Sequence, residues 1–152
     1  MNQEIFVRLI VSAALGVLVG LERESAGKPA GIRTHALVSL GSCMFMLLAI
    51  EGPKVWGTTA LVDPTRLAQG VVTGVGFLGA GAIIQSGTSV QGLTTAATIW
   101  LVCAVGATVG GGLWQIGGVG ALVALILLRG LSFLERAATK VGRKGDSEEN
   151  GG

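Results

Sequence analysis

The strongest constraint on the fold of this chain is a series of five long apolar runs separated by polar connectors. The runs cover Ile5–Leu21, Ala36–Ile50, Leu67–Gln85, Leu93–Val109 and Ile116–Leu134. A transmembrane helix needs roughly 17–25 mostly apolar residues, so the first run lies at the short end of that range and the second run is shorter still. Lipid offers the backbone no hydrogen-bond partner, which means that a run crossing a bilayer must be helical. We therefore predict an all-α, polytopic membrane helix bundle with about five transmembrane helices.

Composition supports the same class. The chain is 50% hydrophobic and 13% charged, whereas about a quarter of the residues of a soluble domain are charged. The net charge of +2 is small, and the basic residues cluster at the ends of the runs instead of forming a stripe, so no nucleic-acid partner is expected. Cys43 and Cys103 lie inside apolar runs without metal-binding spacing, which is typical of small buried side chains.

Glycine and alanine recur through Gly70–Gln85, GVVTGVGFLGAGAIIQ. In water each interior glycine would cost a helix about 1 kcal/mol relative to alanine. In a bilayer, small residues instead let neighbouring helices approach closely. We therefore predict that this stretch forms a central, protein-buried transmembrane helix. The glycines expected to serve helix packing in the whole chain are Gly16, Gly20, Gly70, Gly74, Gly76, Gly79, Gly81 and Gly106.

The same stretch contains GVGFLG at 74–79, a formal match to the dinucleotide fingerprint GxGxxG. That fingerprint requires a strand before it, a helix after it and an acidic residue about 20 positions further on. Here Pro64 precedes the run, and no acidic residue occurs from Ser86 to Val119. Membrane packing is therefore favoured and no cofactor is predicted. Mg²⁺ stays open as a ligand or signal.

The distribution of positive charge predicts the orientation in the membrane. The first connector carries Arg23, Lys28 and Arg33, further Lys and Arg residues follow Leu134, and none precedes Ile5. The positive-inside rule then places the amino terminus outside and the carboxyl terminus in the cytoplasm. We expect one transmembrane domain over residues 1–138. Residues 139–152 are predicted to be a disordered polar tail, because the closing stretch GRKGDSEENGG lacks apolar side chains.

With this topology, polar residues from several connectors meet at the cytoplasmic end. Small residues recur every four positions at Ser12, Gly16 and Gly20, and this stripe continues to Arg23 and Glu24. Because successive helical residues turn by about 100°, we expect Arg23 or Glu24 to face the bundle, and Glu22 to point away. The candidate ligand or partner residues at this end are Glu22, Arg23, Glu24, Arg33, Thr34, His35, Gln85, Thr94 and Thr95, with Arg129 and Glu135 arriving from the fifth run.

Two interpretations of this group stay open: a structural network that holds the connectors to the helix ends, and a site for a ligand or partner. Catalysis is not expected, because no nucleophile, base and acid occur together and the single histidine begins a helix. His35, Ser39, Ser42 and Met46 share one helical face, which we expect to point into the protein because lipid would penalise it.

The opposite end of the bundle carries a second set of charges. Glu4 and Arg8 have the spacing of an i,i+4 ion pair, and Arg8 could either extend to the interface or serve a function. Asp63 and Pro64 read as the N-cap and first residue of a helix. Asp63 and Arg66 are also candidate residues for a ligand or partner.

Cation transport is the main alternative to a binding role. Magnesium prefers octahedral oxygen ligands and releases water reluctantly, so a dehydrating site usually contains carboxylates. The five runs have none near the middle of the membrane. A carboxylate-lined path is therefore hard to build from a single chain, whereas a path for a hydrated ion stays open. The alternative function is a magnesium, other cation or small-solute transporter that acts as an oligomer whose interface supplies the path.

Four segments together form a specific combination: GLERE at 20–24, GIRTHALVSLG at 31–41, DPTRLAQGVVTGVGFLGAGAII at 63–84 and GLTTAATIWL at 92–101. They resemble the MgtC/SapB family of bacterial cytoplasmic-membrane proteins, over about residues 4–134. The resemblance implies a link to growth under magnesium limitation and, in pathogens, to survival inside host cells. It also implies a regulator that engages other membrane proteins, notably the proton-translocating ATP synthase.

By this resemblance, the family motifs include Glu22, Arg23, Glu24, Arg33, Thr34, His35, Asp63, Arg66, Thr94 and Thr95. Many family members carry a soluble cytoplasmic domain after the fifth span, and we expect only the transmembrane part here. We hypothesise a non-enzymatic, multi-pass protein of the bacterial inner membrane, linked to magnesium homeostasis through another membrane protein. Glycine-rich spans offer surplus packing surface, so a homo-oligomer, preferably a dimer, is also expected.

Overall fold

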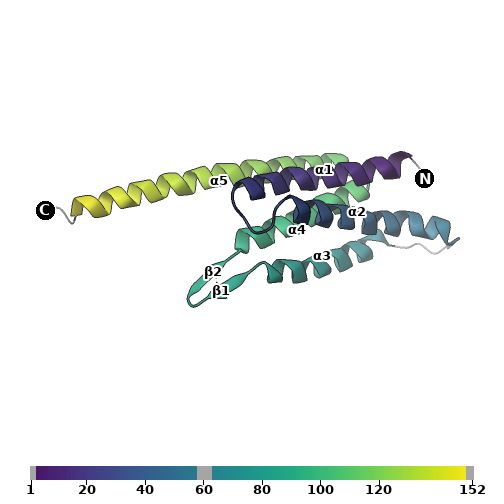
Figure 1. Ribbon diagram of the computed structural model, residues 1–152. Helices are drawn as coiled ribbons and strands as arrows, with labels where there is room; N and C mark the ends of the chain where they lie inside the picture. The colour runs from purple at the N-terminus through teal and green to yellow at the C-terminus, as the bar shows by residue number, and fades with distance from the viewer. Residues whose placement is uncertain (1–2, 58–62, 150–152) are drawn as a thin grey trace.

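The structure is a computed structural model that describes residues 3–57 and 63–149, with side chains described as far as Leu131 except at Pro64 and Ser86. Its helices and strands are α1 (Gln3–Ser25), α2 (Ile32–Val55), α3 (Pro64–Gly81), β1 (Ile84–Ser86), β2 (Ser89–Gln91), α4 (Leu93–Gly110) and α5 (Trp114–Glu149). The helices alternate in direction along a common axis, which leaves the two ends of the chain at opposite ends of the bundle (Figure 1). The all-α prediction is confirmed.

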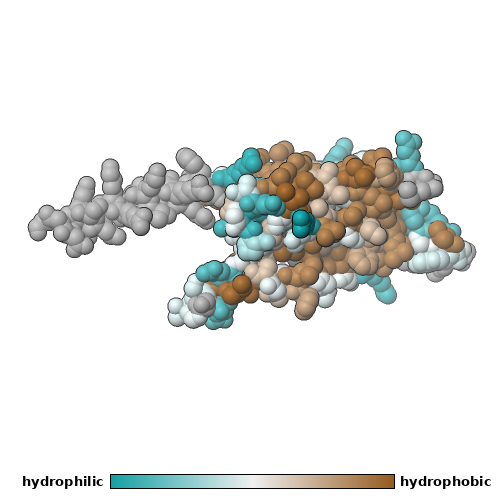
Figure 2. All heavy atoms as spheres, in the orientation of Figure 1, coloured by the Kyte–Doolittle hydropathy of each residue, from teal (hydrophilic) through white to brown (hydrophobic). Residues whose placement is uncertain are grey.

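Among the described residues, four helices are long and apolar enough to cross a membrane: α1, α2, α4 and α5 as far as Leu131. Apolar side chains cover the middle of the visible face, and polar side chains gather towards its two ends (Figure 2). This pattern is the one expected for helices whose middle sections contact lipid. The fifth helix, α3, is less apolar because Arg66 and Gln69 lie in its first turns.

Helix α4 is the centre of the bundle, since it contacts each of the other four helices. Its side chains contribute Val102 and Val105 to one apolar cluster, with Val19 of α1 and Ala121 of α5. No charged residue occurs between its first and last positions. Because burying an unpaired charge is costly, such a segment can be surrounded by protein on all sides.

Several glycines, including the three that follow, lie at close contacts between α1, α2 and α4. A Cβ atom added to Gly16 would be 2.6 Å from the carbonyl oxygen of His35, and one on Gly20 would be 2.6 Å from the Cα atom of Ile32. At Gly106 the added atom would be 2.0 Å from the carbonyl oxygen of Ser39. Only glycine fits these positions without moving a backbone, so the three helices pack through their main chains.

The prediction of a central, protein-buried helix at 70–85 is wrong. Helix α3 lies at the edge of the bundle, where it contacts α4 and α2. A Cβ atom added at Gly70, Gly74, Gly76 or Gly81 would meet nothing within 4 Å, and one at Gly79 would make an ordinary contact of 3.8 Å with Ala96. Glycines let a neighbouring helix approach but supply no side-chain contacts of their own, whereas α4 contributes Ile99, Val102 and Val105 to the apolar core, so α4 and not α3 is central.

Helix α3 also ends earlier than expected, at Gly81, and an antiparallel hairpin replaces the predicted connector. Its strands pair Ile84 with Gln91 and Ser86 with Ser89. Gly92 closes the hairpin in a left-handed conformation, with φ of 86°, and a Cβ there would lie 1.9 Å from the carbonyl oxygen of Ala82. Glycine is therefore required at this residue.

Helix α5 has the bounds Trp114–Glu149. The side chain of Glu135 lies outside the described residues, as do all side chains after Leu131. The proposed division into a domain at 1–138 and a disordered tail at 139–152 stays a prediction.

Candidate functional site

The turn between α1 and α2 brings two charged side chains into the protein interior. Arg23 is 2% exposed and Glu22 is 4% exposed. The Nε atom of Arg23 donates to Oε2 of Glu22 at 2.5 Å, and its Nη2 atom donates to Oε1 at 2.9 Å. Such a bidentate arginine–carboxylate pair is among the strongest hydrogen-bonded arrangements in proteins. Both oxygens of this buried carboxylate therefore already have a partner.

The burial of Glu22 corrects one expectation. Arg23 faces the bundle as predicted, but Glu22 is buried beside it and Glu24 is exposed. Helix α1 contacts α2, α4 and α5, so protein covers a wider arc of its surface than the single stripe of small residues indicated. Neighbouring residues can then both be inside, provided that their charges compensate each other.

His35 is fully buried one turn into α2. Its Nδ1 atom lies 2.9 Å from the carbonyl oxygen of Gly31, and its Nε2 atom lies 3.2 Å from the hydroxyl oxygen of Thr98. A carbonyl only accepts, so Nδ1 carries a proton and donates it. The Glu22–Arg23 pair makes no hydrogen bond to the ring among the described residues, but it is buried at the same end of the bundle. We call the five buried polar side chains at this end the buried polar cluster: Glu22, Arg23, His35, Thr95 and Thr98.

Thr98 is shared between two acceptors within this cluster. Its hydroxyl donates to the carbonyl oxygen of Thr95 at 2.8 Å and also lies beside the His35 ring. In the neutral ring Nε2 would compete for that single proton, whereas in the protonated ring Nε2 would donate to Thr98 instead. Sequence reasoning missed Thr98 as a member of the site, although it lies one turn after Thr95 on the same face of α4.

Glu24 has a local role at the surface. The backbone N–H of Ile32 donates to its Oε2 atom at 3.0 Å. Gly31, the N-cap residue of α2, has no side chain that could make this bond. Glu24 therefore caps α2 from the neighbouring helix, which explains physically why GLERE and GIRTH belong together.

The polar face of α2 continues inward from His35 as a line of satisfied hydroxyls. Ser39 donates to the carbonyl oxygen of Ser12 at 2.7 Å. Ser42 lies 2.8 Å from the carbonyl oxygen of Val38 and 3.1 Å from the sulfur of Cys103. These side chains point into protein as the sequence predicted. Since they bond mainly to main-chain oxygens, they bind helices to one another and do not form a continuous path.

The remaining candidates fall into two groups. Those at the same end of the bundle as the buried polar cluster but on its surface are Arg33, Thr34, Gln85 and Thr94. Asp63 and Arg66 begin α3 at the opposite end (Figure 1). Oδ1 of Asp63 accepts from the hydroxyl and from the backbone N–H of Thr65, at 2.7 and 2.9 Å, and these bonds lower the pKa of Asp63. Arg129 is exposed on α5.

At that opposite end, Arg8 joins α1 to α4. It pairs with Glu4, as its spacing indicated. Its Nη1 atom also donates to the carbonyl oxygen of Gly110 at 2.8 Å. The side chain is 15% exposed, so it does not simply extend to the interface. Arg8 satisfies the carbonyl of Gly110 at the end of α4, whereas the three carbonyls before it accept from the backbone N–H groups of residues 111–113.

Metal binding finds little support in the described part of the chain. No group of three or more His, Cys, Asp or Glu side chains is placed there to hold a metal ion. The buried carboxylate of Glu22 faces a guanidinium, which already supplies the positive charge that a cation would bring. The chemistry of the cluster therefore suits internal pairing better than a dehydrated Mg²⁺.

The membrane-length helices and the paired charges at one end define a multi-pass α-helical membrane protein. The chain belongs to the MgtC family, whose family model matches residues 9–137. The predicted resemblance is therefore confirmed. No solved structure matches the chain.

Curated relatives extend beyond this chain. Protein SrpB of Synechococcus elongatus is 42% identical over 139 residues, which cover 86% of this chain and 76% of SrpB. A protein of Escherichia coli named "Putative magnesium transporter YhiD" is 42% identical over 130 residues, which cover 84% of this chain and 60% of that protein. Protein MgtC of Salmonella typhimurium is 38% identical over 134 residues, covering 88% and 53% respectively. The chain thus spans between about half and three quarters of these relatives.

Proposed function

We propose that this protein is a non-enzymatic protein of the bacterial inner membrane that acts in magnesium homeostasis or adaptation to low magnesium. In this proposal it acts by engaging another membrane protein. The magnesium link is supported by family membership and by the name of the relative YhiD. The proton-translocating ATP synthase, which the family resemblance implies, is the partner to test first.

The observation that carries the proposal is the internal pairing of the buried polar cluster. Glu22 is the buried carboxylate of the described residues, and Arg23 occupies both of its oxygens. Moving such a carboxylate to a dehydrated cation would leave the Arg23 charge buried and unpaired, which is strongly unfavourable. A rigid cluster is better suited to hold the surface above it in one conformation for a partner.

The surface above the cluster supplies the proposed contact. We define the partner surface as Arg33, Thr34, Gln85 and Thr94, all of them exposed at this end of the bundle. An exposed arginine is a common anchor in protein interfaces. Two hydrogen bonds position α2 beneath this surface: the N–H of Ile32 donates to Glu24, and the His35 ring donates to the carbonyl oxygen of Gly31.

A growth assay at low magnesium tests the proposal, with a deletion strain complemented by wild type or by variants. We expect the deletion to slow growth only at low magnesium, and Arg33→Gln to restore growth less well than Lys28→Gln. Lys28 is the matched control because it is exposed in the turn just before α2 but lies outside the partner surface. Equal growth of the deletion strain and wild type at low magnesium would contradict the proposed role.

A co-purification experiment tests the partner itself. Wild type should retain ATP synthase subunits after mild detergent extraction from magnesium-starved cells, and Arg33→Gln should retain fewer at equal expression. The Lys28→Gln variant should behave as wild type. If Arg33→Gln grows poorly at low magnesium but retains as much ATP synthase as wild type does, the ATP synthase is not the partner. The proposed magnesium role would then still stand.

A second candidate is a magnesium, other cation or small-solute transporter that acts as an oligomer, preferably a dimer. The open glycine face of α3 favours it, because a second copy could pack there and supply a path between chains. Proteoliposomes containing the protein should then take up magnesium faster than empty liposomes. Equal fluxes would exclude this candidate.

A further inference from the structure

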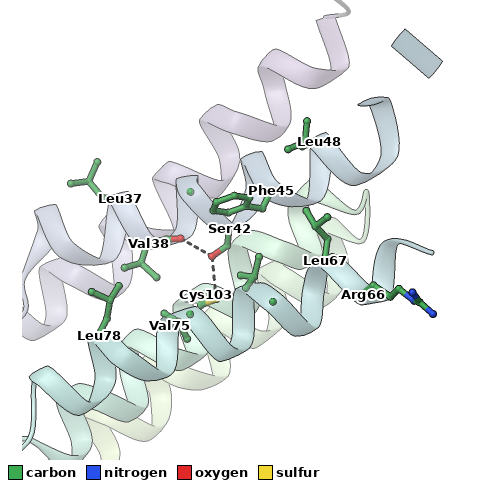
Figure 3. Close-up of a pocket in the computed structure, with 14 residues that line it drawn as sticks. Leu37, Val38, Ser42, Phe45, Leu48, Arg66, Leu67, Val75, Leu78 and Cys103 are labelled. Atoms are coloured by element: carbon green, nitrogen blue, oxygen red, sulfur yellow. Dashed lines mark hydrogen bonds between the residues drawn. The ribbon is translucent and has the colours of Figure 1, made fainter. Parts of the chain in front are cut away.

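A long groove lies between α2 and α3, with α4 as its floor, and has a volume of about 720 Å³. Leu37, Phe45 and Leu48 of α2 and Leu67, Val75 and Leu78 of α3 line its two walls (Figure 3). The volume falls within the roughly 300–1,000 Å³ typical of small-molecule sites. Because α2 spans the membrane and α3 lies at the edge of the bundle, the groove belongs to the part of the protein that faces lipid.

The groove exists because α3 lacks side chains where it passes α2. Gly70 and Gly74 both line it, and a Cβ atom at either residue would meet nothing within 4 Å. Helix α3 instead contacts the bundle through Val75 and Gly79, which are its two buried residues among those whose burial is described. Because the groove opens toward the bilayer and its walls are mainly apolar, hydrocarbon fills it more favourably than water would.

The interior of the groove suits a hydrocarbon chain. Its described polar groups are Ser42 and Cys103 on the floor and Arg66 at one end. Ser42 already bonds to Val38 and to Cys103 (Figure 3). Its hydroxyl proton is therefore not available to a polar ligand, and the walls offer a ligand apolar contacts only.

Arg66 gives the groove one charged end. Its guanidinium points outward from the first turn of α3 (Figure 3) and makes no hydrogen bond or ion pair among the described residues. The nearby carboxylate of Asp63 accepts from Thr65 instead. A guanidinium matches the geometry of a phosphate with two parallel hydrogen bonds. The groove thus combines an apolar channel with a cation at the end nearest the membrane surface.

We propose that the α2–α3 groove binds an anionic phospholipid, with an acyl chain between the two helices and the phosphate on Arg66. The proposal is independent of the magnesium role. Charge complementarity favours a lipid of net negative charge over a zwitterionic one, whose own ammonium group would compete with Arg66. A second copy of the chain or a partner helix would fill the same apolar walls but would leave the guanidinium without an anion.

Native mass spectrometry of the full chain, released from nanodiscs, tests the proposal. With phosphatidylglycerol the wild type should retain one lipid per chain. With phosphatidylcholine retention should fall roughly tenfold, because its ammonium group lies close to the phosphate and weakens the attraction of the headgroup to Arg66. Arg66→Gln should remove the preference between the two lipids. Gly74→Leu should remove binding of both, because its side chain would occupy the groove.

Two matched variants separate binding from general effects. Gly76→Leu places the same side chain on the same helix in open space, but Gly76 does not line the groove. Lys54→Gln removes a positive charge at the same end of the bundle, where Lys54 pairs with Glu51. Both should retain lipid as wild type does, and all variants should show similar melting temperatures in detergent.

Two outcomes would overturn the proposal. One is equal retention of phosphatidylglycerol by wild type and folded Gly74→Leu. The other is a change from dimer to monomer in Gly74→Leu with lipid retention unchanged, which would identify a second copy as the occupant. Retention that fails in Gly74→Leu and Arg66→Gln but persists in the two controls would support the lipid site.

Discussion

Two regions of this molecule use glycine in opposite ways. Where α1, α2 and α4 meet, Gly16 and Gly106 let main chains touch, and a single added carbon would collide with a backbone oxygen. Along α3, Gly70, Gly74 and Gly76 face open space. The same residue type at the same helical spacing therefore marks a close contact in one region and a vacant surface in the other. The difference shows that small-residue spacing indicates what a helix allows, not what it contacts.

The largest effect should come from breaking the buried ion pair in the tight region. Replacing Arg23 by Met leaves the Glu22 carboxylate buried without a counter-charge, which should cost about 3–5 kcal/mol. We expect a large loss of folded protein in detergent, measured by reversible unfolding or by melting temperature. Arg33→Gln, at the same end but exposed, is the control and should change little. A wild-type melting temperature for Arg23→Met would contradict the pairing described here.

Gly106→Ala should have the next largest effect. The added carbon would lie 2.0 Å from the carbonyl oxygen of Ser39, and separating two packed helices typically costs about 1–3 kcal/mol or more. Gly76→Ala on α3 is the matched control, because it adds the same atom in open space. It should be neutral or slightly stabilising. Equal melting temperatures of the two variants would remove the contrast between the regions.

A smaller effect is expected at the cap of α2. Glu24→Ala removes the acceptor for the N–H of Ile32, and loss of a helix cap typically costs about 1 kcal/mol. Hydrogen exchange should show faster exchange of the first amides of α2, with the core of α4 unchanged. Glu24→Gln, which keeps an acceptor oxygen, should restore most of the protection. Unchanged exchange in Glu24→Ala would show that water replaces this cap without cost.

The smallest effect concerns pH at the start of α3. Hydrogen bonds from Thr65 lower the pKa of Asp63 in the folded protein. A carboxyl with a lowered folded pKa contributes stability above its unfolded pKa, and this is lost as pH falls through the folded value. The stability difference between wild type and Asp63→Asn should therefore shrink in acid. A difference that grows on acidification would contradict this assignment.

Much of the fold could be predicted because lipid restricts the options of the backbone. Each of the five apolar runs appears as a helix, and Arg23, His35 and Thr95 are indeed inside the protein at one end. The Asp63 cap was readable for the same local reason, since N-cap chemistry depends on residues only two positions apart. The earlier end of α3 and its hairpin were missed, because Gly92 can only be recognised as obligatory once Ala82 is seen against it.

The site was predictable by residue type more than by role. The sequence does not single out Thr98, because a lone threonine in an apolar run looks like a satisfied hydroxyl. Only the fold brings it into contact with His35, which is 63 residues away in the sequence. The sequence predicts the wrong side for Glu22, because a single stripe of small residues indicates one buried face whereas α1 has three neighbouring helices. Glu24 is exposed and caps α2. Helical spacing could not predict this role, because the hydrogen bond crosses the turn between two helices.

The amino-acid sequence by itself determined that the chain is helical and lies in a membrane, because lipid leaves no other way to satisfy the backbone of its apolar runs. It also determined the family, through motifs spread along the chain. Only the tertiary structure decided that α4 is central and α3 peripheral, which glycines are contacts, and which charges are paired. Those outcomes depend on what lies opposite each residue, and the helical period specifies a direction without specifying a neighbour.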